Sequence, residues 1–118
     1  MNTPVQTTTR QRWLELIAQY PEEMAVEHRR KHRRRQPALG TLELAFQRDN
    51  RPVKRTGKLL NASPTGVLVK QQEWIADHTL VLMRLLYDDA VIRLLGRVAH
   101  CTQTVGGYKV GIELEFAD

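Results

Sequence analysis

Tyr108-Lys109-Val110-Gly111-Ile112-Glu113-Leu114-Glu115-Phe116 is the stretch that decides the fold. An aromatic or aliphatic residue occupies every second position, and the residues between them are lysine, glycine or glutamate. This period of two is typical of a β-strand with one buried and one exposed face. Val105-Gly106-Gly107 comes just before it and predicts a hairpin turn, because glycine adopts the positive φ that tight hairpins need. The end of the chain therefore predicts antiparallel β-structure.

The chain between residues 41 and 101 extends this prediction. Strands are expected at about 41–46, 53–60, 67–70, 79–87 and 91–101, with turns at 49–52, 61–66 and 88–89. Six closely spaced antiparallel strands on one core predict closure into a small barrel, because closure leaves no exposed strand edge. Gly96 is expected to mark a bulge or a tight bend. Trp74 and Ile75 are expected to anchor the connection 71–78.

A helix is expected over residues 9–20, because Thr8 and Gln11 match a capping box at its start. Its apolar residues share one face, and they are Trp13, Leu14, Leu16, Ile17 and Tyr20. We expect this face to pack on the barrel, and contact with a second copy or a partner protein is the alternative. A second short helix is expected from Pro21 to about Glu27. The fold class is thus mostly β, a six-stranded antiparallel barrel with a short N-terminal helical extension.

Length and composition limit the class of protein. The chain has 118 residues, which is the size of one domain with its own core. Its only cysteine, Cys101, has no partner for an internal disulfide, and no Cys/His cluster has metal-ligand spacing. The N-terminus lacks the charged and apolar segments of a signal peptide, and no apolar run is long enough to span a bilayer. We expect a cytoplasmic protein without a membrane span, a metal or a cofactor.

Arg29-Arg30-Lys31-His32-Arg33-Arg34-Arg35 holds the excess positive charge. The chain has 18 Lys and Arg against 13 Asp and Glu, and six of the cations lie in this run, so that 12 remain elsewhere. A guanidinium binds phosphate oxygens or the O6/N7 edge of guanine through two parallel hydrogen bonds. The run therefore predicts a phosphate-bearing anion as ligand. Taken alone, it is equally typical of a nucleic-acid arm, an anionic-membrane contact or a solvated linker.

Asn61-x-Ser63-x-x-Gly66 is the second candidate segment. Its carboxamide and hydroxyl can bond the polar edge of a guanine, and its glycine permits close approach of backbone or ligand. The alternative is a turn in which these residues serve only the local backbone.

The two segments together resemble the PilZ domain family, which has Arg-x-x-x-Arg before the first strand and (Asp/Asn)-x-Ser-x-x-Gly between the second and third. The first motif is matched by Arg30 and Arg34, preceded by Arg29 as is common in the family, and also by Arg29 and Arg33. Gly96-Arg97-Val98 and Gly111-Ile112-Glu113 extend the resemblance, which covers about residues 28–116. We therefore divide the chain into an N-terminal helical extension, residues 1–27, and a PilZ-type barrel domain, residues 28–118, that includes an arginine-rich arm, residues 28–35.

The resemblance implies a receptor for cyclic di-GMP. Arg30 and Arg34 would clamp phosphate and guanine, with Arg29 as an accessory contact. In this family an extra arginine beside the motif is associated with binding two stacked ligand molecules instead of one. The second motif, Asn61, Ser63 and Gly66, would form the wall on the barrel side. His100 departs from the family, where a large aromatic residue is common at this position. A helix often follows the last strand in the family, and here we expect the N-terminal helices to cover the barrel instead.

The resulting prediction is a receptor or adaptor without catalytic activity that passes a signal to a protein partner. Ligand binding is expected to draw residues 28–35 onto the barrel and to change the angle of the N-terminal helices. The alternatives are an adaptor that needs no nucleotide and a nucleic-acid-binding barrel, which the seven aromatic residues (two Phe, three Tyr, two Trp) do not favour. His28 and His32 lie among cations that repel a metal, and no nucleophile accompanies the acidic turns at residues 77–78 and 88–89.

Overall fold

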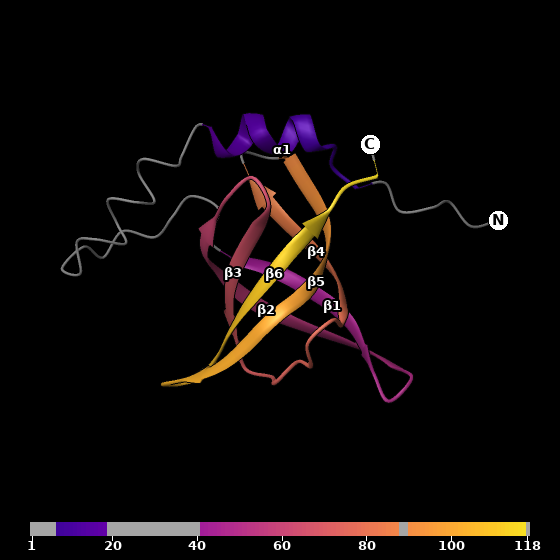
Figure 1. Cartoon of the computed structure of the whole chain (residues 1–118), viewed down its shortest axis with the longest axis vertical. Helices are drawn as coiled ribbons and strands as arrows, with labels where there is room; N and C mark the ends of the chain where they lie inside the picture. The colour runs from indigo at the N-terminus through magenta and orange to yellow at the C-terminus, as the bar shows by residue number, and fades with distance from the viewer. Residues whose placement is uncertain (1–6, 19–40, 88–89, 118) are drawn as a thin grey trace.

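The computed structural model describes residues 7–18, 41–87 and 90–117. Six strands close into a barrel in the order β1-β2-β3-β6-β5-β4, and every neighbouring pair is antiparallel (Figure 1). The elements are α1 (Arg10–Ile17), β1 (Thr41–Arg48), β2 (Arg51–Ala62), β3 (Gly66–Gln71), β4 (Leu80–Tyr87), β5 (Ala90–Thr104) and β6 (Gly107–Glu115). The predicted mostly β fold, a six-stranded antiparallel barrel with a short N-terminal helix, is confirmed.

Two predicted features, the turn at residues 49–52 and the bulge at Gly96, lie at different positions in the structure. Asp49 and Asn50 both have positive φ, 53° and 64°, so they form a two-residue hairpin turn, and Arg51 and Pro52 belong to β2 rather than to the turn. The bulge expected at Gly96 lies instead in β5 between Val98 and His100. Gly96 keeps its register with both neighbouring strands, and a Cβ there would lie 2.6 Å from the Glu113 carbonyl oxygen.

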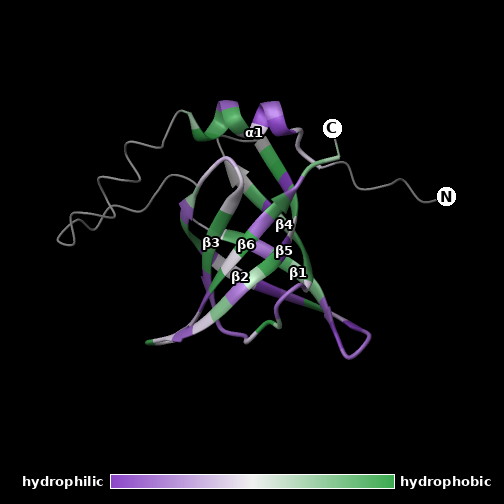
Figure 2. Ribbon diagram, viewed as in Figure 1, coloured by the Kyte–Doolittle hydropathy of each residue, from purple (hydrophilic) through white to green (hydrophobic). Residues whose placement is uncertain are grey.

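Helix α1 lies across one end of the barrel and closes it (Figure 1). Trp13, Leu16 and Ile17 are buried in the same apolar cluster as the inward faces of the strands, so the expected packing of the helix on its own barrel is confirmed. Figure 2 shows apolar and polar residues intermingled along the strands, as one-sided burial requires. Leu14, expected on the same face, is 39% exposed.

The start of α1 differs from the expected capping box. Thr9, not Thr8, is the N-cap, since its Oγ1 accepts a hydrogen bond from the backbone N–H of Arg12 at 3.1 Å. Thr8 is held on β5 instead, because its N–H donates to the Arg93 carbonyl at 2.7 Å and its hydroxyl accepts from the Arg93 N–H at 3.2 Å. The helix ends at Ile17, and Tyr20 and the helix expected from Pro21 lie outside the described residues.

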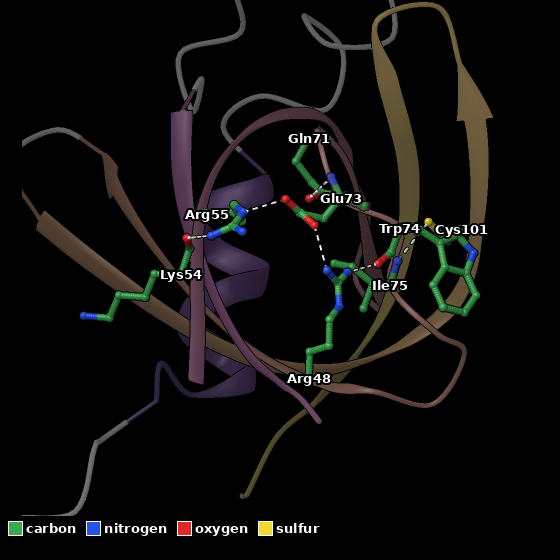
Figure 3. A network of polar contacts seen from close by, with 8 residues as sticks. All are labelled: Arg48, Lys54, Arg55, Gln71, Glu73, Trp74, Ile75 and Cys101. Carbon is green, nitrogen blue, oxygen red and sulfur yellow. Dashed lines mark hydrogen bonds and ion pairs between the residues drawn. The ribbon is translucent and has the colours of Figure 1, made fainter. Parts of the chain in front are cut away.

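The connection between β3 and β4 lies at the opposite end of the barrel (Figure 1). Ile75 is its buried anchor, whereas Trp74 is 56% exposed, so only half of the predicted anchor is correct. The Glu73 carboxylate accepts hydrogen bonds from Arg48 Nη1 and Arg55 Nε, both at 2.8 Å (Figure 3). Hydrogen bonds from Arg55, and next from Arg48, hold the pKa of Glu73 below its usual range. This ion cluster fixes the connection to the β1–β2 hairpin.

No helix among the described residues is long and apolar enough to cross a membrane.

Candidate ligand-binding site

The turn between β2 and β3 carries Asn61, Ser63 and Gly66, and Ser63 organises it. The Ser63 hydroxyl accepts hydrogen bonds from the backbone N–H of Gly66 at 3.0 Å and of Thr65 at 3.3 Å. The Ser63 N–H also donates to the Gly66 carbonyl at 2.8 Å. Because these bonds close the turn on itself, the side chain gives the backbone here one fixed shape. The local turn expected for this segment is therefore present.

Gly66 and Asn61 hold the two ends of this turn. A Cβ at Gly66 would lie 2.9 Å from the Ile112 carbonyl oxygen, so the glycine allows β3 to approach β6 closely. The Thr65 carbonyl accepts from the Leu114 N–H at 2.8 Å and ties the turn to the same strand. Asn61 Oδ1 accepts from the Ala62 N–H at 2.8 Å, which leaves the amide NH2 group to donate elsewhere.

The turn forms the rim of an open hollow of about 290 Å³ on the outside of the barrel. Its floor is made by the outer faces of β3, β5 and β6. The bulge in β5 has a direct effect here, because an extra residue lets two consecutive side chains, Ala99 and His100, line the same hollow. The residues that line it are Asn61, Ala62, Ser63, Thr65, Gly66, Val67, Leu68, Ala99, His100, Gly111, Ile112 and Glu113.

The imidazole of His100 lies directly against Gly111. A Cβ at Gly111 would be 2.3 Å from His100 Nε2 and 2.6 Å from its Cε1, so a side chain at this position would displace the ring from where it lies. The ring therefore offers a flat surface at the floor of the hollow. A guanine base has a π-face that stacks on such a ring.

Glu113 is the only charged residue that lines the hollow within the described ranges. Its side chain is exposed, and no hydrogen bond or ion pair joins its carboxylate to another described residue. The neighbouring Arg97 instead binds Glu115 through Nε and Oε2 at 2.8 Å. A carboxylate in this position can accept hydrogen bonds from the N1–H and N2–H2 donors of guanine.

The turn is also tied to helix α1. Trp13 Nε1 donates a hydrogen bond to the Ser63 carbonyl at 2.9 Å, and the Trp13 side chain is completely buried. Buried indole N–H groups usually find such a partner, because leaving the group unpaired costs free energy. A residue of the N-terminal helix thus contacts the backbone of the second motif directly.

The structure brings together the predicted site residues that belong to the barrel. Those of the arginine-rich arm, residues 28–35, are outside the described residues. Asn61, Ser63 and Gly66 lie at one rim, whereas Arg29, Arg30 and Arg34 fall outside the described residues. The sequence did not predict the contact of Trp13 with the turn. It also gave no reason to place Glu113 in the site, although the alternation of residues 108–116 puts it on the outer face.

The described residues contain no group of three or more His, Cys, Asp and Glu that could hold a metal ion. The turn that contains Asp77 and His78 is part of the β3–β4 connection, and the His78 N–H donates to the Val98 carbonyl at 2.7 Å. Cys101 is half-buried, and its sulfur lies 3.5 Å from the Ile75 nitrogen. The other predicted acidic turn, residues 88–89, is outside the described ranges.

The fold and this geometry define a closed antiparallel β-barrel with an open hollow on its outer surface and polar groups at the rim of that hollow. The chain belongs to the PilZ domain family, whose model matches residues 28–118. PilZ domains generally bind cyclic di-GMP and are typically non-catalytic receptor domains. No curated protein matches the chain.

Proposed function

We propose that this protein is a receptor for cyclic di-GMP, without catalytic activity, which binds the ligand in the hollow between the 62–65 turn and His100. The observation that carries the proposal is the rim itself. Asn61, Ser63 and Gly66 lie at one edge of a hollow that also offers a flat ring and an unpaired carboxylate. These groups suit the polar edge and the face of a guanine.

In this proposal Ser63 and Gly66 act mainly by shaping the rim, because their hydrogen bonds and close approach are made within the turn and to β6. The Asn61 amide and the Glu113 carboxylate make the contacts with the base. Neither group adds positive charge, so the two phosphates need cations from elsewhere. We assign that role to Arg30 and Arg34, with Arg29 as an accessory contact. These arginines belong to the proposed barrel domain, residues 28–118, which follows the N-terminal extension, residues 1–27.

Helix α1 is the proposed output of the receptor. The Trp13 hydrogen bond joins it to the Ser63 carbonyl, so a ligand that shifts the turn also acts on the helix. A protein partner in the cytoplasm would detect this change. A Trp74→Phe variant leaves Trp13 as the sole tryptophan, since the chain has two. Saturation with cyclic di-GMP is expected to change its emission, and unchanged emission together with unchanged hydrogen exchange over residues 9–35 would contradict this output.

Calorimetric titration of cyclic di-GMP into the purified protein tests the binding, with Arg30→Ala and Arg34→Ala as the variants. Each bidentate arginine contact is worth about 1–3 kcal/mol, so each loss is expected to weaken binding roughly tenfold to a hundredfold. Arg51→Ala is the matched control, because Arg51 is an exposed arginine at the β1–β2 hairpin, away from the hollow. An excess of GTP is expected to leave binding unchanged. Equal losses in all three variants would show general charge attraction instead of a site.

The same titration separates the two alternative functions. Nucleic-acid binding weakens steeply with salt in proportion to the phosphates contacted, whereas a ligand with two phosphates shows a shallow dependence. An adaptor that needs no nucleotide would give no heat with cyclic di-GMP at all. The helix face expected to serve such an adaptor is already used, because Trp13 and Ile17 are buried on the barrel.

A further inference from the structure

Three lysines stand directly opposite one another on adjacent strands of the barrel. Lys58 of β2 pairs with Lys70 of β3, and Lys70 pairs in turn with Lys109 of β6. Residues that are directly opposite project from the same face of a sheet. Their buried neighbours Leu59, Val69 and Val110 point into the core, so the lysines lie on the outer face. We name Lys58, Lys70 and Lys109 the lysine row.

The row is electrostatically unfavourable for the isolated barrel. Like charges directly opposite one another on adjacent strands destabilise a sheet, and adjacent strands are only about 4.8 Å apart. Within the described part of the chain, no ion pair joins any of the three lysines to a carboxylate. Thr102 is the residue of β5 opposite Lys109, so the row is not neutralised from that side either.

Protection of an exposed strand edge does not explain these lysines. Edge strands often carry lysine, because its charge prevents pairing with another chain. Here β2, β3 and β6 are each hydrogen-bonded on both sides in a closed barrel, so they have no edge to protect. A bound anion would neutralise the row and relieve this repulsion.

The row lies beside the ligand hollow. Leu68 and Gly111 both line the hollow, and they stand two residues from Lys70 and Lys109 on the same outer faces of β3 and β6. Two residues of a strand span about 7 Å. Lys70 Nζ lies 3.7 Å from where a Cβ on Gly106 would be, near the β5–β6 turn, and its flexible four-carbon stem allows it to reorient.

We propose that the lysine row binds phosphate groups of a nucleotide whose base occupies the hollow, and so forms an anion subsite on the barrel itself. The inference rests on the proposed function for the identity of that nucleotide, cyclic di-GMP. It goes beyond that function by adding barrel lysines to Arg30 and Arg34 as groups that bind the phosphates. The described residues that line the hollow can contact a base, and one of them, Glu113, carries a carboxylate. None of them is a lysine or an arginine. The lysine row supplies cations within reach of the same ligand.

Calorimetry with Lys70→Gln and Lys109→Gln tests the subsite. Each variant is expected to bind cyclic di-GMP roughly threefold to tenfold more weakly, with a shallower dependence on salt, because one partly screened charge contact is lost. Lys70→Arg is expected to retain binding. Lys54→Gln is the matched control, since Lys54 is an exposed lysine of β2 opposite Ala45 and away from the hollow. Equal affinity in the wild type, Lys70→Gln and Lys109→Gln would overturn the inference while leaving the receptor function intact.

Two measurements without cyclic di-GMP distinguish a failure of the lysine subsite from a failure of the receptor function. Lys70→Gln is expected to raise the melting temperature at low ionic strength, because repulsion within the row is relieved, and Lys54→Gln is not. Inorganic pyrophosphate is expected to stabilise the wild type and Lys54→Gln more than Lys70→Gln. If the wild type gave no heat with cyclic di-GMP, the receptor function would fail, and this pyrophosphate comparison would decide the subsite alone. Equal pyrophosphate stabilisation in all variants would then overturn it.

Discussion

Replacement of Trp13 by phenylalanine should destabilise the protein strongly, because the indole is completely buried and donates to the Ser63 carbonyl at 2.9 Å. The hydrogen bond itself is worth about 0.5–1.5 kcal/mol, because Ser63 is an exposed residue whose carbonyl can bind water in place of the indole. The smaller ring also removes two buried carbon atoms at about 0.8 kcal/mol each, so the total is about 2–3 kcal/mol. Urea unfolding measures it, and the midpoint should fall by about 1–3 M for an m-value of roughly 1–3 kcal/mol/M.

Trp74→Phe is the control for this measurement, because Trp74 is 56% exposed and its ring makes no described hydrogen bond. Its effect should stay within about 0.5 kcal/mol of the wild type. Replacing Trp13 with benzothienylalanine, which keeps the two rings but has no N–H, should retain the cost of the hydrogen bond alone, about 0.5–1.5 kcal/mol. A Trp13→Phe protein with the midpoint of Trp74→Phe would refute the link between the helix and the turn.

The remaining predictions concern the ion cluster and two glycines. Glu73→Gln should lower the free energy of unfolding at pH 7, and this deficit should disappear at acid pH. The reason is that the pKa of Glu73 is lowered in the folded state, so its carboxylate stabilises the fold above the ordinary pKa of about 4.3, and this stability is lost as the pH falls through the lowered pKa. Urea midpoints at pH 7 and pH 3 check this, and an equal deficit at both pH values would contradict it. Gly66→Ala should cost about 1–3 kcal/mol, because its Cβ meets the Ile112 carbonyl, which is fixed by strand pairing. Gly111→Ala should cost less than about 1 kcal/mol, because the exposed His100 ring can turn away, and thermal melts that rank the two variants the other way would be contrary evidence.

The fold was accessible from the sequence because its strands alternate. In 108–116 every second residue is buried or half-buried, and the Gly106 turn has the positive φ that its sequence predicted. The errors fall where one backbone angle or one extra residue decides the outcome. The turn at Asp49 and Asn50 is shorter than its four turn-forming residues suggested, and the bulge lies near Ala99 because it depends on the pairing of β5 with β6.

The candidate site was accessible only where its residues are close in sequence. Asn61, Ser63 and Gly66 form one motif, so the turn could be recognised before the barrel was known. Trp13 and Glu113 come from segments about fifty residues to either side, and only strand register and helix packing bring them to the turn. The lysine row is the same kind of feature, because Lys58, Lys70 and Lys109 become neighbours only through the register of three strands.

The most direct test of the receptor function is a titration of the isotope-labelled protein with cyclic di-GMP, followed by two-dimensional ¹H–¹⁵N NMR. The account predicts saturable shifts at the amides that line the hollow, above all residues 61–68, 99–100 and 111–113, and at the Trp13 indole N–H, which contacts the turn. Amides around Glu73, at the other end of the barrel, should stay unchanged. A spectrum that does not change with ligand, or one that changes only at the β1–β2 hairpin, would contradict it.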